Sequence, residues 1–310
     1  MANAYTDTTA LAGLVKAAYD RYVEFALRSQ PLFRSLADKR PVQQAMPGSS
    51  VVFSLYQDLA AATSTLTETS DPDAVALSNV NTVSVTLAEY GNTVLNTRKL
   101  GEFAFSDVDP AVANIVAFNM ADSIDKVVVN TLIGGSNVLY GGTRSSTATV
   151  TATDTITGAK VRKAVAKLRA ANAVPREGML YAGYIHPEVA HDLRSETGSL
   201  AFEDIRKYTE PNVGNLLSQT TGVLGGAYFV ETPRAYVAAD GASSAKVYRT
   251  IIAGQQALAE ATAVEPGVVI GPVVDKLMRF RPIGWYALAG WSIFRDAALY
   301  RIETGSSIAS

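Results

Sequence analysis

Apolar side chains recur with a helical period of about 3.6 residues in several stretches of the chain. Residues 9–28 form the first stretch, and residues 110–133 form the longest, which stops at a pair of glycines. Residues 160–171 form the third, with cations on the outward positions, and a short helix is expected after Pro187. The apolar stripe of the longest helix consists of Val112, Ile115, Val116, Met120, Ile124, Val127, Val128 and Leu132. We therefore predict a long, strut-like helix in the first half of the chain.

Apolar and polar residues alternate with a period of two over residues 50–59 and 80–97, which is typical of strands. The stretch between them is polar and rich in threonine, and it is too long for a tight hairpin turn. Further strands are expected at 179–185, 225–235, 246–254 and 267–275, with two more between 281 and 305. Because helices and strands are interleaved without a regular strand–helix–strand repeat, we predict an α+β fold rather than a doubly wound α/β fold.

Two parts of the chain have little core of their own. Pro31, Pro41 and Pro47 prevent a helix there, so the stretch after residue 30 is expected to be an extended arm, which often lies on a neighbouring molecule. The two-stranded excursion at residues 46–97 is marginal alone and should rest on another subunit. It contains five carboxylates and no lysine or arginine, so its docking surface is predicted to be basic.

The composition narrows the possible functions. Apolar residues make up 48% of the 310-residue chain, which excludes disorder, and the length favours two or three lobes. A formal net charge of −2 argues against tight DNA binding, and the absence of cysteine excludes disulfides and thiolate chemistry. Only 18% of the residues are charged, so an oligomer is expected to cover much of the surface. The longest uncharged apolar stretch, residues 282–294, is too short to span a membrane.

No arrangement of residues indicates an enzyme. The segment from His186 to Asp192 contains the only cluster of metal-ligand type, with Glu188 and His191 between its ends. Residues five apart on a helix point about 140° from each other, so the two histidines cannot share an ion as an i, i+4 pair does. We therefore expect no catalytic, cofactor-binding or metal-binding residues. The two tryptophans, six residues apart, are assigned to the core or to a subunit interface.

The order of these parts resembles the major capsid protein of tailed double-stranded-DNA bacteriophages, whose fold is shared with herpesvirus capsid floors and encapsulins. The strings YIHPEVAHDLR at 184–194, GGAYFVETPRA at 225–235 and GWYALAGWSIFRDAALYRIETG at 284–305 are similar to stretches of these coat proteins. The resemblance implies five parts. They are an N-terminal arm (1–45), an extended β-hairpin loop (46–98), a peripheral domain with a long spine helix (99–154), an axial domain (155–265) and a return into the peripheral domain (266–310).

The resemblance also implies a function. Such a protein self-assembles as hexamers and pentamers into an icosahedral shell around phage double-stranded DNA, and each extended loop lies on an adjacent subunit. The implied partners are scaffolding and portal proteins, decoration proteins in some members, and DNA contacted weakly and non-specifically, with no membrane. The protein would belong to the virion capsid and assemble in the cytoplasm of the bacterial host.

Two features of this sequence differ from the family pattern, and each leads to an expectation about how the protein assembles. Some members cross-link their subunits through a lysine of the extended loop, and this loop has no lysine, so no such cross-link is expected. Some members begin with a long helical scaffolding segment, whereas this chain runs almost directly into its arm. We therefore expect a separate scaffolding protein or a segment that has already been removed.

Contacts between subunits are expected to pair the acidic loop with cations of a neighbour. The acidic residues are Glu68, Asp71 and Asp73. Their candidate partners are Arg28, Arg34, Lys39 and Arg40 on the arm, or Lys160, Lys163 and Lys167 on the basic helix. Two alternatives stay open on the sequence alone. One is an encapsulin-like compartment around a cargo protein, and the other is a metal-dependent hydrolase that uses the His186–Asp192 cluster.

Overall fold

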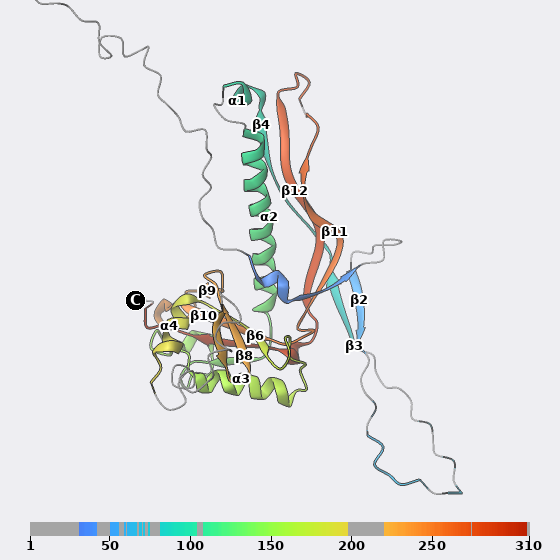
Figure 1. Ribbon diagram of the computed structural model, residues 1–310, viewed down its shortest axis with the longest axis vertical. Coiled ribbons are helices and arrows are strands. Elements are labelled where there is room, and N and C mark those ends of the chain that lie inside the picture. Colours follow the sequence, from blue (N-terminus) through green and yellow to red (C-terminus); the bar gives the residue numbers. More distant parts are fainter. Residues whose placement is uncertain are drawn as a thin grey trace, which may run out of the picture.

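The computed structural model describes residues 31–41, 50–55, 59, 61–66, 68–69, 71, 74, 81–103, 108–197, 220–273 and 275–308. The helix expected at 9–28 lies outside these residues, as do Arg28 and Asp73. The described chain forms two bodies connected by one long helix (Figure 1). Among the described residues, no helix is long and apolar enough to cross a membrane.

The first body is a long four-stranded sheet with a helix along it (Figure 1). Its order is β1 (Ala37–Pro41), β11 (Leu258–Ile270), β12 (Phe280–Ile293) and β4 (Ala88–Thr97), and only β1 and β11 are parallel neighbours. The helix α1 (Arg98–Phe103) follows β4 at one end of the sheet, and α2 (Val108–Leu132) runs back along the sheet. The strands β2 (Ser50–Leu55) and β3 (Asn81–Thr86) form a separate antiparallel pair.

The second body is built around a seven-stranded sheet. Its main path runs β5 (Val138–Tyr140), β13 (Leu299–Thr304), β10 (Val247–Ala253), β6 (Tyr181–Ile185), β8 (Ala227–Glu231) and β7 (Thr220–Leu224), and β9 (Val237–Ala238) pairs with β10. The helices of this body are α3 (Gly158–Ala170) and α4 (Pro187–Ser195). The described chain also contains four short 3-10 turns: η2 (Phe33–Leu36), which precedes β1, and η3 (Thr147–Thr149), η5 (Ala242–Ser244) and η6 (Asp296–Ala298). Strands and helices are mixed without a regular repeat, which confirms the α+β prediction.

The helix α2 contributes to the cores of both bodies. Near its start, Val116 packs with Trp285 of the long sheet, and near its end, Ile124 and Leu132 join the main core with the seven-stranded sheet. Its 25 residues span about 38 Å, which confirms the predicted strut. Ile115 was assigned to the buried stripe, but 45% of it is exposed. Neighbouring helical positions point about 100° apart, and Val116 takes the inward direction.

Most predicted elements are confirmed, and the differences lie in strand pairing. The predicted strand 80–97 is two strands, because β3 pairs with β2 whereas β4 pairs with β12, so the chain changes partner at Leu87. The strand expected at 267–275 is longer and starts earlier, at Leu258. The short strands β5, β7 and β9 were not predicted, since two to five residues carry too little periodicity.

The end of the expected arm lies on its own chain rather than on a neighbour. Strand β1 pairs in parallel with β11, from Ala37 opposite Leu258 to Pro41 opposite Thr262. Just before it, Phe33 is fully buried in the main core. The prolines do keep this stretch extended, but β11 offers an open edge that satisfies its backbone hydrogen bonds.

A buried carboxylate holds this arm in register on the sheet. Glu260 of β11 is fully buried and accepts hydrogen bonds from Arg34, with 2.6 Å between Nη2 and Oε1, and from the indole N–H of Trp291 at 3.1 Å. Burial alone would raise the pKa of Glu260, but the hydrogen bonds and charge of Arg34, with Trp291 and Thr262, hold it below its ordinary value. Arg34 also contacts Glu265 at 3.1 Å.

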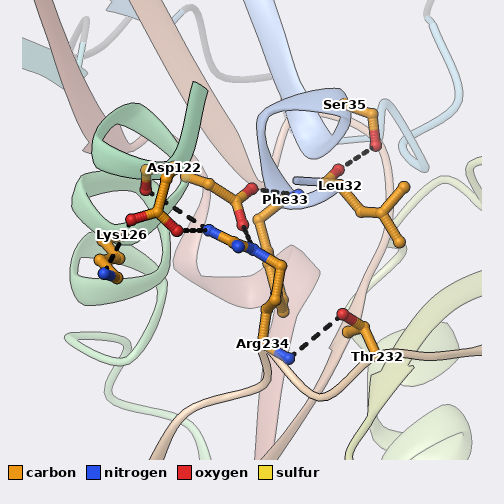
Figure 2. Close-up of polar contacts among 8 residues, drawn as sticks. Leu32, Phe33, Ser35, Asp122, Lys126, Thr232 and Arg234 are labelled. Carbon is orange, nitrogen blue, oxygen red and sulfur yellow. Dashed lines mark hydrogen bonds and ion pairs between the residues drawn. The ribbon is translucent and has the colours of Figure 1, made fainter. Parts of the chain in front are cut away.

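A second buried carboxylate joins the arm, α2 and the seven-stranded body (Figure 2). Asp125 of α2 accepts the backbone N–H of Phe33 at 2.7 Å and pairs with Arg234 Nε at 2.8 Å. Arg234 follows β8 and also pairs with Asp122. Burial alone would raise the pKa of Asp122, but hydrogen bonds from Lys126 and Arg234 hold it below its ordinary value. The carboxylate of Asp125 thus connects three segments that are distant in sequence.

Removing the buried carboxylate of α2 should weaken this joint strongly. We expect Asp125→Ala to lower the free energy of unfolding of the unassembled chain by about 3 kcal/mol, because it leaves the Phe33 N–H and Arg234 incompletely paired. Lys126→Ala is the matched control, since that cation pairs with Asp122 but is 71% exposed, and it should cost less than about 1 kcal/mol. Urea unfolding measures both, and equal losses would contradict the role of Asp125.

The anchor of the arm should also depend on pH. Since the folded-state pKa of Glu260 is lowered, its contribution is present above its unfolded pKa of about 4.3 and is lost as pH falls through the lower folded value. At pH 7 we expect Glu260→Gln to be less stable than the wild type by about 2 kcal/mol, because a charged hydrogen bond is lost. Urea unfolding between pH 7 and 3 should show this difference shrinking below about pH 4. A difference that stays constant across the range would be inconsistent with an ionised Glu260.

Candidate inter-subunit surfaces

The described residues of the acidic stretch between β2 and β3 are exposed. Glu68 and Asp71 are exposed, and so is every other residue described between 59 and 74. We call residues 59–74 the limb. Its described part includes two large apolar side chains, Leu59 and Leu66, that are 55% and 76% exposed. Within the described residues, no ion pair involves Glu68 or Asp71, so the structure leaves these carboxylates available to another molecule.

The basic helix α3 is confirmed, with its cations on the outside. The hydroxyl of Thr157 caps its start by accepting the N–H of Lys160, and Val161, Val165 and Leu168 are buried. Lys163 and Lys167 are exposed and Lys160 is partly exposed. Among the described residues, none of these three lysines forms an ion pair. All charged side chains of α3 are therefore cations, and its three lysines form no ion pair within the described chain.

The arm provides fewer cations for a neighbour than the sequence indicated. Arg34 binds Glu260 and Glu265 of its own chain, so its guanidinium is already paired within the subunit. The reason is β1: once the arm pairs with β11, the guanidinium lies beside a buried carboxylate. Lys39 is exposed, whereas the side chain of Arg40 lies outside the described part.

The cluster around His186 fastens α4 to its surroundings. His186 precedes the helix, and its Nδ1 accepts the N–H of Glu188 at 3.3 Å, while the carboxylate of Glu188 accepts the hydroxyl of Tyr248. Asp192 is buried and accepts the N–H of Ser307 at 3.0 Å. Burial lowers the pKa of His186 despite the nearby charge of Glu188, and burial together with Glu188 raises the pKa of Tyr248.

These hydrogen bonds connect α4 with β10 and with the C-terminal residues. Among the described residues, no three side chains of histidine, aspartate or glutamate gather as metal ligands.

The two tryptophans also make their contacts inside the chain. Trp285 donates to Asn119 of α2 at 2.9 Å and Trp291 to Glu260, and both are nearly buried, which assigns them to the core rather than to an interface.

Sequence reasoning missed one surface, at the end of the long sheet that lies farthest from the seven-stranded sheet (Figure 1). Several large apolar side chains are exposed there: Val94, Leu95, Leu100, Val269, Ile270, Val273, Leu277 and Met278. Alternation along β4 and β12 predicted strands correctly, but it could not show that the described chain leaves both faces of β4 uncovered from residue 91 to residue 95. Exposed apolar clusters of this kind mark interaction sites.

Comparisons with known proteins place this geometry in a family. A family model described as phage capsid protein matches residues 3–308. The fold is similar to the capsid of Ralstonia phage GP4, with a TM-score of 0.74 and 17% identity over 96% of this chain and 97% of that chain. The cyanophage Pam1 capsid also gives 0.74, with 15% identity over 99% and 100% of the two chains.

A third similar structure is the capsid of Helicobacter pylori bacteriophage KHP30, with a TM-score of 0.70 and 15% identity over 98% of this chain and 99% of that chain. A search of curated proteins by sequence gives no match. At such identities the solved structures establish the fold, and the family match over nearly the whole chain establishes the membership. The chain belongs to the phage capsid protein family.

Proposed function

We propose that copies of this chain assemble as hexamers and pentamers around phage double-stranded DNA. As a major capsid protein it is a structural component of the virion that forms icosahedral shells, and it is not an enzyme. The observation that carries the assembly mechanism is the limb, whose described residues are all exposed. A chain that leaves apolar and acidic residues extended into solvent is suited to bury them on a second copy.

The parts of the fold support separate structural roles for different segments of the chain. We assign residues 1–45 to an arm and 46–98 to an extended loop. We further assign 99–154 and 266–310 to a peripheral domain with α2 as its spine, and 155–265 to an axial domain around the symmetry axes. The two sheets, with α2 between their cores, support two bodies. Three strands favour other bounds than these: β11 belongs to the long sheet from Leu258 on, whereas β5 and β13 belong to the seven-stranded sheet and so to the axial body.

The charges support contacts that set register more than strength. In this proposal Glu68, Asp71 and Asp73 of one subunit meet cations of the next, with Lys39, Arg40, Lys160, Lys163 and Lys167 as candidates. Exposed ion pairs contribute only about 0–1 kcal/mol each, so apolar burial has to supply most of the adhesion.

Other partners follow from the same proposal. Scaffolding and portal proteins, and in some systems decoration proteins, would bind the shell. A net charge of −2 suits a shell that contacts its DNA weakly and without sequence preference.

Electron microscopy tests the proposed assembly directly. The purified chain, alone and co-expressed with the products of neighbouring genes, should form closed shells or rings of five and six subunits. A monodisperse small particle under every condition would overturn the proposal.

The role of the limb in docking is tested by reversing its charge. We expect the variant with Glu68→Lys, Asp71→Lys and Asp73→Lys to lose assembly at low salt, since like charges would then meet at the contact. Sedimentation measures the assembled fraction. Glu177→Lys is the control, because Glu177 is exposed outside the limb, and it should assemble as the wild type does. Normal assembly of the triple variant would refute electrostatic docking of the limb.

A further inference from the structure

We propose that the outer side of α3 binds the phosphate backbone of the double-stranded DNA that the shell encloses. We call this side the α3 face, and its cations are Lys160, Arg162, Lys163, Lys167 and Arg169. The inference rests on the proposed function, in which the shell encloses DNA. It assigns the lysines of α3 to DNA rather than to the limb of a neighbouring copy.

The cations of the chain are concentrated on this helix. Residues 158–170 contain five of the 27 basic residues and none of the 29 acidic residues, so the rest of the chain has a formal charge of −7. Binding to nucleic acid depends on local clusters of cations that neutralise phosphates. A net charge of −2 therefore excludes a strong overall attraction to DNA, whereas the α3 face still provides a local and weak one.

The helical spacing arranges the α3 face as a low ridge with cations on both flanks. Successive residues of a helix point about 100° apart, so the outward direction is occupied by three exposed alanines, Ala159, Ala166 and Ala170. The three lysines follow one flank of this ridge, and Arg162 and Arg169 follow the other. Because alanine is small, a strand of phosphates can approach the helix closely and meet cations on both sides.

The two faces of the seven-stranded sheet are covered by different parts of the chain. Successive residues of a strand point to opposite faces, so Tyr181 and Tyr184 of β6 do so as well. Tyr184 packs on Phe33 of the arm with 4.9 Å between the ring centroids, whereas Tyr181 donates to the carbonyl oxygen of Ala173, just after α3, at 2.8 Å. The arm and α3 therefore lie on opposite faces, and α3 follows the border of the second body that faces away from the long sheet (Figure 1).

The turn between β7 and β8 supports the arginine flank. Gly225 and Gly226 have φ values of 61° and 98°, in the left-handed region that favours glycine. A Cβ on Gly225 would lie 2.7 Å from Cγ of Arg162, and a Cβ on Gly226 would lie 2.6 Å from Nη2 of Arg169. The two glycines thus let the turn lie directly against both arginine side chains, which holds this flank in place before a ligand binds.

The charges of α3 are unfavourable for the helix itself. Solvated helix faces are commonly stabilised by glutamate and lysine four residues apart, but Lys163 and Lys167 place two like charges at this spacing. Lys160 lies in the first turn, where the helix dipole disfavours a cation. Glu196 accepts the N–H of Gly158 at 2.7 Å, so the proposed phosphate contacts lie along the flanks and not at the helix start. A polyanion along the flanks would replace repulsion between the cations with attraction.

The limb of a neighbouring copy fits the α3 face less well than DNA does. The large apolar residues of α3 are buried, so the face offers no large apolar side chain to Leu59 and Leu66, which are 55% and 76% exposed. Interfaces between proteins have a desolvated apolar centre and are depleted in lysine. A phosphate backbone needs cations and hydrogen-bond donors, which the α3 face supplies.

Salt-dependent binding to DNA tests the proposal. We expect the unassembled full chain to bind a short DNA duplex of arbitrary sequence at low salt, measured by fluorescence anisotropy. The Lys160→Gln, Lys163→Gln, Lys167→Gln variant should keep the melting temperature of the wild type, because glutamine has a similar helix propensity. It should bind the duplex at least about tenfold more weakly, and the slope of log affinity against log salt should decrease by about 2–3, since each phosphate contact contributes about 0.9.

A control variant separates the α3 face from the net charge. Lys39→Gln, Lys99→Gln, Lys126→Gln removes the same charge from exposed positions outside α3 and should bind the duplex within about twofold of the wild type. Equal losses in the two variants would overturn the proposal, and so would a wild type that does not bind the duplex at low salt. Loss of assembly in the α3 variant with unchanged DNA binding would assign the helix to a contact between subunits instead.

Electron microscopy of DNA-filled shells tests the same assignment in the assembly. We expect α3 to lie on the inner surface of the shell, with DNA density in contact with the α3 face. Shells with α3 on the outer surface would overturn this inference alone and leave the proposed function intact. A wild type that never forms shells would refute the proposed function itself.

Discussion

The buried pair of Asp125 and Arg234 is the constraint on which the arrangement of the molecule depends. Asp125 lies in the second half of α2, Arg234 belongs to the seven-stranded body, and the same carboxylate accepts the N–H of Phe33 in the arm. A buried charge is tolerated only when it is paired, so the three segments have to meet in one geometry. The pair therefore fixes where the arm leaves the body and how α2 enters it.

From this joint, α2 transmits the geometry to the far end of the long sheet. Its second half is part of the main core, and its first half packs through Val116 on Ile283 and Trp285 of β12. Glu260 adds a second anchor by holding Arg34, so the arm and β11 move together. The result is a frame of two bodies that share one helix, which suits a subunit that must repeat the same contacts many times in a shell.

The frame leaves apolar side chains exposed in two regions. The described part of the limb carries exposed leucines, and the end of the long sheet farthest from the seven-stranded sheet carries exposed leucine, methionine and β-branched residues. Surfaces that are covered in an assembly do not need charges for solubility, and this agrees with the low content of charged residues in the sequence.

The sequence by itself determined the elements, since helical and strand periods are local properties: α2, α3, β6, β10 and β12 all lie where the pattern predicted them. Its composition and the order of its parts also determined the family. Only the tertiary structure decided that Arg34 pairs with Glu260, a residue 226 positions away. It also decided which apolar side chains stay exposed at the end of the long sheet. Both depend on which strands become neighbours, and a one-dimensional pattern does not contain that information.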